Sequence, residues 1–213
     1  MTTTIKSLKS YKTPLRYPGG KSRACKKMEP YIPDLRDYEV YYEPFLGGGS
    51  VALHITKKYP KLKIVVNDLY EPLYNFWLQL QVNGDYVHSQ LQQLKSRFPD
   101  RGSARGLFED AKEKLYDLDI VDKDRAVCFY IINKCSFSGL TESSSFSPQA
   151  SDANFSMRGI DKLPVYSKLI EDWYITNVDY RHLLGDKEKT FIYLDPPYDI
   201  KDNLYGRKGS MHK

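Results

Sequence analysis

The chain has few cysteines and few histidines, and none of them is spaced like a metal ligand. Its three cysteines, Cys25, Cys128 and Cys135, are odd in number and form no C-x-x-C pair, which argues against a disulfide framework and against a zinc site. The four histidines are scattered and include no pair at helical spacing. We therefore expect no bound metal.

Long apolar runs are missing as well. The basic N-terminus lacks the apolar stretch of a signal peptide, and no segment approaches membrane-spanning length. We therefore predict a cytoplasmic protein without a membrane partner. At 213 residues, of which 41% are hydrophobic, the chain is long enough for one large domain, or for one domain with a substantial insertion.

Acidic residues are absent from the first 28 positions. Eight basic residues occupy this segment before Glu29: Lys6, Lys9, Lys12, Arg16, Lys21, Arg23, Lys26 and Lys27. The segment is either a solvated basic tail or an arm that contacts phosphates. The net charge of +5 favours a polyanionic partner without proving one.

Two strand–helix units follow each other near the N-terminus. A β-prone run, Val40 to Phe45, is followed by the glycines of "LGGGS" and by an apolar-periodic stretch. A second, buried strand covers Leu62 to Val66, and Glu71 to Val82 has the pattern of a helix. Successive βα units predict an α/β fold, a parallel sheet wound with helices.

An insertion divides this α/β pattern. Residues from Asp85 to about Ile132 have helical periodicity, and the serine-rich stretch from Ser136 to Ser156 is either a functional loop or disordered. Strand-plus-helix sequence returns at Asp172 to Leu184, and a last strand covers Thr190 to Leu194. We therefore predict an α/β domain from residues 1–84 and 171–213, with an inserted domain at residues 85–170.

The glycine cluster and a following acid suggest a nucleotide-like ligand. Glycines after a strand let backbone N–H groups and a helix N-terminus approach a ligand, although an ordinary tight turn is also possible. Asp68 closes the next strand 21 positions after Gly47, where an acid binds ribose hydroxyls in dinucleotide folds; a helix N-cap is the alternative. Together they favour an adenosine-containing ligand. "YPGGKSR" lacks the spacing of a phosphate-binding loop, which disfavours a nucleoside triphosphatase.

The segment "DPPY" offers hydrogen-bond acceptors beside an aromatic ring. Asp195 stands at the carboxyl end of a strand, where open α/β sheets bind ligands. Pro196 and Pro197 fix φ and remove two N–H donors, and Tyr198 adds a π face. An acceptor-only cluster next to an aromatic ring suits an amino group on a planar ring, whereas a simple turn would not require the flanking aromatic.

The motifs "LRYPGGK", "YYEPFLGGGS", "VVNDLYEPLYN" and "YLDPPY", in this order, resemble the DNA adenine methyltransferases of the Dam family. The resemblance implies a doubly wound, Rossmann-like sheet that binds S-adenosyl-L-methionine, with a mainly helical target-recognition insertion, and a double-stranded DNA substrate. It implies these cofactor-binding residues: Tyr17, Lys21, Glu43, Phe45, Gly47, Gly49, Asp68, Asp179 and Asp195. It implies that the catalytic residues are Asp195, Pro196, Pro197 and Tyr198. The DNA-binding residues would be Lys134, Phe137, Ser138, Leu140 and Glu142.

The sequence departs from the family pattern at two places. Where relatives that modify GATC have an arginine, two positions after the leucine of an asparagine–glycine–leucine run, this chain has Glu142. A carboxylate cannot replace an arginine that reads guanine, so we expect a DNA target other than GATC. Family members also continue through three more strands after the D-P-P-Y motif. We predict the strand order 3-2-1-4 with the last strand at an edge, and a truncated form of a complete enzyme.

Three other functions remain open. The same acceptor cluster would suit another planar amine, such as that of cytosine, an RNA base or a glutamine amide. A non-catalytic fragment that binds cofactor or DNA, or that needs a partner chain, is the alternative from a different class. A nicotinamide oxidoreductase comes third, because it would not explain the D-P-P-Y segment.

Overall fold

A four-stranded parallel sheet forms one part of the protein. The computed structural model describes residues 12–17, 19–139, 144–185 and 188–197. The strands are β1 (Val40–Glu43), β2 (Lys63–Asn67), β3 (Tyr174–Thr176) and β4 (Thr190–Ile192). They are ordered β3-β2-β1-β4, and every neighbouring pair is parallel. The predicted α/β class and strand order 3-2-1-4 are confirmed.

Register and burial place the two central strands in the core. Tyr41 pairs with Ile64 of β2 on one side and with Phe191 of β4 on the other. Tyr41 and Ile64 are buried, as apolar side chains on a covered parallel sheet should be. Within the described residues β4 pairs only with β1.

The connections near the sheet are helical and short. In the N-terminal part these elements are η1 (Lys21–Arg23), α1 (Cys25–Met28), η2 (Glu29–Tyr31) and η3 (Leu35–Asp37). Helix α2 (Ser50–Lys58) follows the glycine loop, and α3 (Glu71–Val82) follows β2. The bounds of α3 are those predicted. Pro72 in its first turn has a φ suited to a helix start and gives up no intrahelical hydrogen bond there.

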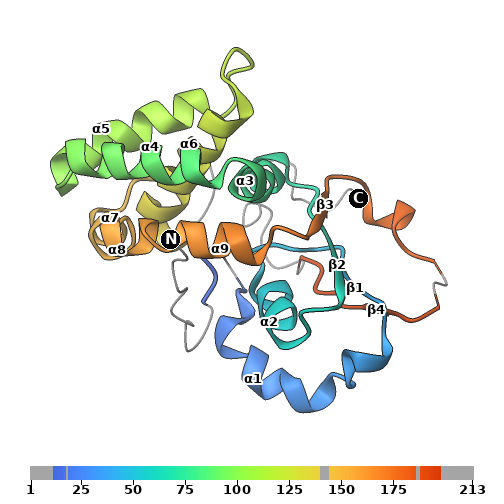
Figure 1. Ribbon diagram of the computed structural model, residues 1–213. Coiled ribbons are helices and arrows are strands. Elements are labelled where there is room, and N and C mark those ends of the chain that lie inside the picture. The colour runs from blue at the N-terminus through green and yellow to red at the C-terminus, as the bar shows by residue number, and fades with distance from the viewer. Residues whose placement is uncertain (1–11, 18, 140–143, 186–187, 198–213) are drawn as a thin grey trace, which may run out of the picture.

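The remaining helices gather beside the sheet, on the left and at the top of Figure 1. They are α4 (Gly84–Arg97), α5 (Arg101–Lys114), α6 (Asp122–Cys135), α7 (Pro148–Asn154), α8 (Met157–Ile160) and α9 (Leu163–Leu169). Helix α6 runs through their middle, and all its residues from Ala126 to Cys135 are buried. Helix α3, and α9 within this group, lie nearest to the sheet (Figure 1).

The serine-rich stretch contains helical structure. A 3-10 turn, η4, covers Phe137–Gly139, and α7 begins at Pro148. The Ser147 side chain accepts a hydrogen bond from the N–H of Ala150, which caps α7. Leu140 and Glu142 lie outside the described residues.

One sequence prediction about secondary structure is wrong. After β3 the segment up to Leu184 contains only the 3-10 turn η5 (Tyr180–His182), where we expected a helix. The Asp179 carboxylate accepts from the N–H of Arg181 at 2.9 Å and also binds its guanidinium. These hydrogen bonds from Arg181 to Asp179 stabilise a turn, which competes with formation of a longer helix.

Among the residues that the structure describes, no helix is long and apolar enough to span a membrane. In that same part of the chain, no three His, Cys, Asp or Glu side chains lie close enough to hold a metal ion.

Candidate cofactor and catalytic site

Three chain segments leave the sheet side by side at the carboxyl ends of its strands, which we call the carboxyl edge. β1 leads into the glycine loop, β2 into Asp68, and β4 into Asp195. Because β1 lies between β2 and β4, the glycine loop is flanked by both carboxylates. This edge is where open α/β sheets bind ligands.

The glycine loop is tied to the end of β2. The N–H of Leu46 donates to the Asn67 carbonyl at 2.8 Å, and the N–H of Gly47 donates to Asp68 Oδ2 at 2.8 Å. Gly47 (φ 50°) and Gly49 (φ 67°) have left-handed backbone, which disfavours other residues there. Asp68 thus supports the loop, and its Oδ1 also accepts from the N–H of Tyr70.

Two aromatic rings lie against the loop from different directions. A Cβ on Gly47 would stand 2.9 Å from the Tyr17 ring, and one on Gly49 would stand 2.7 Å from the Trp77 ring. Trp77 is fully buried, and its Nε1 donates to the Gly47 carbonyl at 3.2 Å. The loop is therefore a close-packed cradle that admits no side chains at these positions.

Asn67 joins three segments at the same edge. Its Nδ2 donates to the carbonyls of Pro44 (3.1 Å) and Val178 (3.0 Å). Its Oδ1 accepts from the N–H of Val178 and from the Thr176 hydroxyl, both at 2.9 Å. These bonds fix the starts of the loops after β1 and β3 relative to β2.

Glu43 is buried at the end of β1, where the chain enters the glycine loop. The Tyr41 hydroxyl donates to Glu43 Oε2 at 2.7 Å. Burial raises the pKa of Glu43 to about 8, and the charge of Asp195 adds to this, while hydrogen bonds from Tyr41 and the N–H of Ala52 act against it. Burial also raises the pKa of Asp68 to about 6, against the bonds from Gly47 and Tyr70.

A pH-dependent stability follows from the buried Glu43. Because the pKa in the folded protein lies above the ordinary value of 4.5, the folded state holds a proton that the unfolded chain releases. This stabilisation is complete below about pH 4.5 and is lost as pH rises towards 8, with a slope approaching about 1.4 kcal/mol per pH unit. Glu43→Gln should remove it, measured as the difference between wild-type and variant urea unfolding at pH 6 and pH 8.

Subtracting the variant's free energy of unfolding from that of the wild type isolates the contribution of Glu43. This is needed because another buried group changes stability with pH in the opposite direction. Burial lowers the pKa of Lys134 to about 7, which makes stability rise with pH above that value in both proteins. An equal pH slope in wild type and Glu43→Gln would contradict the assignment to Glu43.

Asp195 reaches the same edge from β4 and carries an ion pair. The N–H of Tyr193 still donates to the Tyr42 carbonyl at 2.8 Å, so the sheet guides the chain to within two residues of Asp195. Lys21 Nζ lies 2.6 Å from Asp195 Oδ2, and each of the two side chains is 23% exposed. The predicted cofactor residue Lys21 therefore contacts the predicted catalytic carboxylate. Pro196 is exposed and Pro197 is half-buried, whereas Tyr198 lies outside the described residues.

A second aromatic pair lies near the loop after β1. The rings of Phe45 and Tyr180 are 5.0 Å apart between centroids. Asp179, predicted to contact the cofactor, precedes Tyr180 and is paired with Arg181 at 2.6 Å. That guanidinium lowers the pKa of Asp179 and keeps it ionised. The structure thus brings Phe45 and Asp179 to neighbouring positions.

The predicted DNA-binding residues differ in position. Phe137 is 67% exposed on η4, which also contains Ser138. Lys134 is buried on α6, with Nζ 5.1 Å from the centroid of the Tyr130 ring. Because its ammonium does not face the surface, we do not assign Lys134 a DNA contact.

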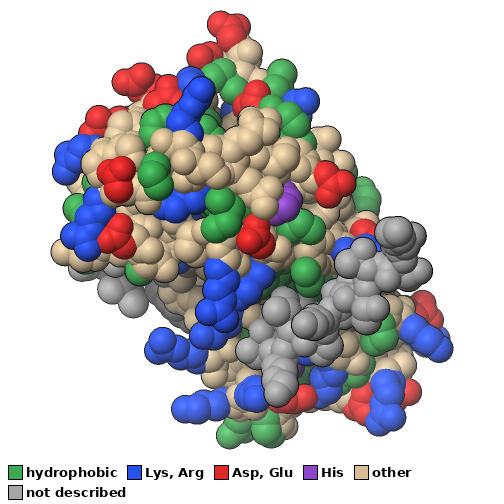
Figure 2. All heavy atoms as spheres, turned by 60° about the vertical axis from the view of Figure 1, so that its left-hand side comes forward, with side chains coloured by type: hydrophobic (Ala, Val, Ile, Leu, Met, Phe, Trp, Pro, Cys, Tyr) green, Lys and Arg blue, Asp and Glu red, His purple; other side chains and the backbone are tan. Residues whose placement is uncertain are grey.

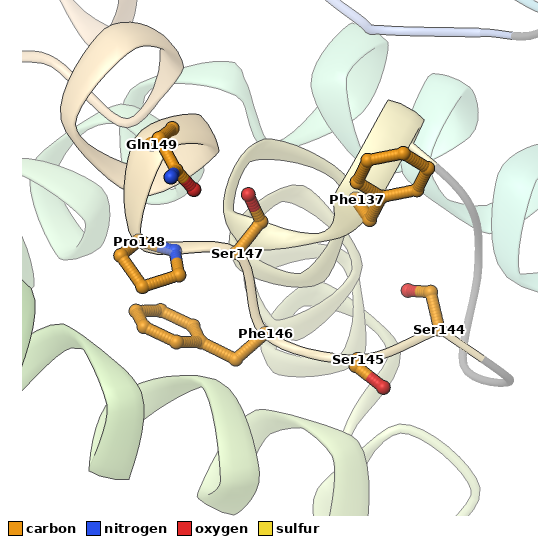
Figure 3. Close-up of a pocket in the computed structure, with 7 residues that line it drawn as sticks. All are labelled: Phe137, Ser144, Ser145, Phe146, Ser147, Pro148 and Gln149. Carbon is orange, nitrogen blue, oxygen red and sulfur yellow. The ribbon is translucent and has the colours of Figure 1, made fainter.

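Phe137 borders a hollow of about 410 Å³. The other lining residues, shown in Figure 3, are Ser144, Ser145, Phe146, Ser147, Pro148 and Gln149. Helix α5 holds one wall: the rings of Phe108 and Phe146 are 5.6 Å apart, and Lys112 Nζ donates to the Ser144 carbonyl at 3.1 Å. The hollow belongs to the helical insertion and not to the glycine loop.

Basic side chains gather on one face of the molecule. Figure 2 shows Lys and Arg side chains along the middle and lower part of one face. Exposed members of the basic N-terminal segment include Lys12, Arg23, Lys26 and Lys27. A surface of this kind suits a polyanion.

Several residues of the site were not predicted. Trp77 could have been suspected, because it is one of only two tryptophans and lies in the helix after Asp68. Asn67 directly precedes Asp68 at the strand end, which is also a sequence signal. The pairing of Arg16 with Asn133, 117 positions apart, has no local signal.

The fold and this edge define an α/β enzyme with a nucleotide-type cradle flanked by carboxylates. The family model of the D12 class N6 adenine-specific DNA methyltransferases matches residues 17–211. The chain belongs to this family, and its class is that of the adenine-specific DNA methyltransferases. The family implies a methyl donor and a DNA substrate.

Three known proteins are similar to the chain. The type II methyltransferase M.MjaIII of Methanocaldococcus jannaschii is 27% identical over 202 residues, which are 86% of this chain and 68% of the relative. The modification methylase StsI of Streptococcus sanguinis is 24% identical, over 96% of this chain and 32% of the relative. The type II methyltransferase M.CviBI of Paramecium bursaria Chlorella virus NC1A is 24% identical, over 90% of this chain and 71% of the relative.

Proposed function

We propose that the protein transfers a methyl group from S-adenosyl-L-methionine to N6 of an adenine flipped out of double-stranded DNA. The observation that carries the proposal is the position of Asp195. Its carboxylate leaves β4 next to the glycine loop of β1 and is held by Lys21 at 2.6 Å. An acceptor is thus fixed beside a nucleotide-type cradle.

The residues at the carboxyl edge fit S-adenosyl-L-methionine. The side-chain-free loop at Gly47 and Gly49, at the start of α2, offers backbone to the methionine end. The Asp68 carboxylate would accept from the ribose hydroxyls, and Phe45 with Asp179 would lie at the adenine. When bound, the cofactor supplies an electrophilic methyl group on a positively charged sulfur.

The acceptors of D-P-P-Y would orient the amine of the target base. The lone pair of an adenine amine is delocalised into the ring. If Asp195 and the Pro196 carbonyl accept its two hydrogens, the nitrogen is favoured in a pyramidal form with an exposed lone pair. Tyr198 would stack on the ring. Positioning and electrostatic stabilisation then lower the barrier, and the base must first leave the stack at a cost of a few kcal/mol.

The helical insertion would select the DNA sequence. We propose that residues 85–170 form the target-recognition domain, and that Phe137 and Ser138 of η4, with Leu140 and Glu142 beyond it, contact the bases. The 67% exposure of Phe137 beside the hollow supports this role. Base contacts carry specificity, while the basic N-terminal segment would supply sequence-independent phosphate contacts.

Transfer of a labelled methyl group tests the proposal. The protein is incubated with S-adenosyl-L-methionine tritiated at the methyl group and with duplex DNA, RNA or protein as separate acceptors. We expect label in DNA. Label in RNA or protein and none in DNA would replace the proposal with methylation of another planar amine.

Lys21 should matter for catalysis through Asp195. Lys21→Ala removes the cation that fixes the carboxylate, so we expect methyl transfer to fall roughly tenfold to a hundredfold, as for loss of a charged hydrogen bond. Cofactor affinity should fall as well. The assay is initial-rate transfer to DNA together with cofactor titration. Lys63→Ala, at an exposed lysine that begins β2 at the end of the sheet opposite the site, serves as the matched control and should retain both properties. Equal rates for the two variants would contradict this role.

A further inference from the structure

One short segment connects the DNA-recognition region to both halves of the proposed active site. We call residues 12–17 and 19–21 the strap. It precedes the sheet in sequence, yet it contacts helices α6 and α9 of the insertion, the glycine loop and Asp195.

The N-terminal end of the strap is hydrogen-bonded to the helical insertion. The Tyr166 hydroxyl of α9 donates to the Lys12 carbonyl. The Arg16 N–H donates to Asn133 Oδ1 at 2.9 Å, and Asn133 Nδ2 donates back to the Arg16 carbonyl at 2.5 Å. The Arg16 guanidinium donates to the Ser136 carbonyl at 2.7 Å. Asn133 is only 3% exposed, so its side chain is shielded from water.

The same amide also holds the turn that carries Phe137. Asn133 Nδ2 donates to the Gly139 carbonyl at 3.3 Å, as well as to Arg16. Gly139 has φ 71°, and a Cβ there would stand 2.5 Å from Arg16 Cβ. η4 and the strap therefore touch directly, and Asn133 bridges them.

The other end of the strap contacts the active site. Tyr17 directly follows Arg16 and lies against Gly47 and Gly48. Lys21, five positions after Arg16, forms the ion pair with Asp195. Arg16 is thus one residue from the side chain that contacts the glycine loop and five residues from the one that pairs with Asp195.

From these contacts we propose that Asn133 is a positioning residue that couples DNA recognition to cofactor binding. The inference rests on the proposed function. DNA bound at η4 fixes Gly139 and, through Asn133, fixes Arg16 and the strap that closes the cradle. Either ligand then orders a segment that the other also needs, so each increases the affinity of the other by the same factor.

The coupling is measured with S-adenosyl-L-homocysteine, which permits no turnover, and a mixed-sequence plasmid duplex. In the wild type we expect the duplex to increase affinity for this probe by roughly fivefold or more. In Asn133→Ala the factor should fall to roughly 2 or less. The amide bridge between η4 and the strap is then lost, and only the direct contact of Gly139 with Arg16 and the Arg16–Ser136 bond remain. An unchanged factor in the variant, or a factor of 1 in the wild type, would overturn the inference.

Gln81→Ala is the matched control for loss of an amide that binds backbone carbonyls, although Gln81 is half-buried. Gln81 Nε2 donates to the carbonyls of Ile170 (2.7 Å) and Trp173 (2.8 Å), away from the strap. It should lower stability as Asn133→Ala does but keep the wild-type coupling factor. Loss of coupling in both variants would mean that general destabilisation is responsible, and would overturn the role of Asn133.

A measurement on the wild type covers the case in which Asn133→Ala does not fold. DNA alone should slow amide hydrogen exchange in residues 12–17 and in residues 46–49 of the glycine loop. Unchanged exchange at the glycine loop would contradict the coupling. Absence of any binding by the probe or by DNA would instead overturn the proposed function, whereas binding of both with independent affinities would overturn this inference alone.

Discussion

Asp195→Ala should reduce methyl transfer to DNA by roughly a hundredfold to a thousandfold, in the range seen when a group that stabilises a transition state is removed. The methyl side chain of alanine can neither accept the amine hydrogens nor pair with Lys21. Because the Asp195 side chain is partly exposed beyond the end of β4, the fold should remain intact. The measurement is initial-rate transfer of labelled methyl groups, with circular dichroism and DNA binding recorded on the same samples.

Two further variants define what the loss means. Asp195→Asn keeps one carbonyl acceptor but places an NH₂ donor near the amine and Lys21, so it should recover little activity. Asp152→Ala removes an acid that is paired with Arg101 in the helical insertion, and it should keep wild-type rates. Transfer by the Asp195→Ala protein at the wild-type rate would exclude the proposed role of this carboxylate.

Trp77→Ala should lower the free energy of unfolding by about 3–5 kcal/mol, the usual effect of emptying a buried tryptophan site. The ring is fully buried, with its centroid 5.8 Å from that of Trp173. Its removal also deprives Gly47 of a hydrogen bond and Gly49 of its neighbour, so cofactor affinity should fall in parallel. Urea unfolding and cofactor titration measure the two effects.

Trp77→Phe separates packing from the hydrogen bond. Phenylalanine retains much of the contact with Gly49 but cannot donate to the Gly47 carbonyl. We therefore expect the free energy of unfolding to fall by about 1 kcal/mol in addition to the effect of the smaller ring. If Trp77→Ala unfolded at the wild-type urea concentration, the glycine loop would not depend on this ring.

The sequence predicted those parts of the fold that rest on local pattern. Val40 to Phe45 and Leu62 to Val66 are β-prone runs next to turn signals, and they overlap the strands β1 and β2. The helix after β3 was predicted wrongly, because Asp179 and Arg181 pair locally and stop the chain in a turn. The burial of Lys134 was also not predicted. All residues of α6 from Ala126 to Cys135 are buried, so this part of the helix has no separate apolar and polar faces from which burial could be inferred.

For the candidate site, the sequence indicated the loops but not their supports. Glycines and acids after strands are short-range signals. Gly47 and Asp68, which we expected to serve one ligand, contact each other directly. Trp77 under the loop and Asn133 beside Arg16 are long-range contacts that depend on how helices pack. The ion pair of Lys21 with Asp195 joins the ends of the described chain, and no local pattern specifies it.

Analysis of the methylated nucleoside tests the central claim most directly. Duplex DNA is incubated with the protein and methyl-labelled S-adenosyl-L-methionine, digested to nucleosides and separated by liquid chromatography with mass detection. We predict label in N6-methyldeoxyadenosine with the wild-type protein, and roughly a hundredfold to a thousandfold less of it with Asp195→Ala after the same incubation time. Label in 4-methyldeoxycytidine, or equal amounts of N6-methyldeoxyadenosine from both proteins, would contradict the assignment of Asp195 as the acceptor for an adenine amine.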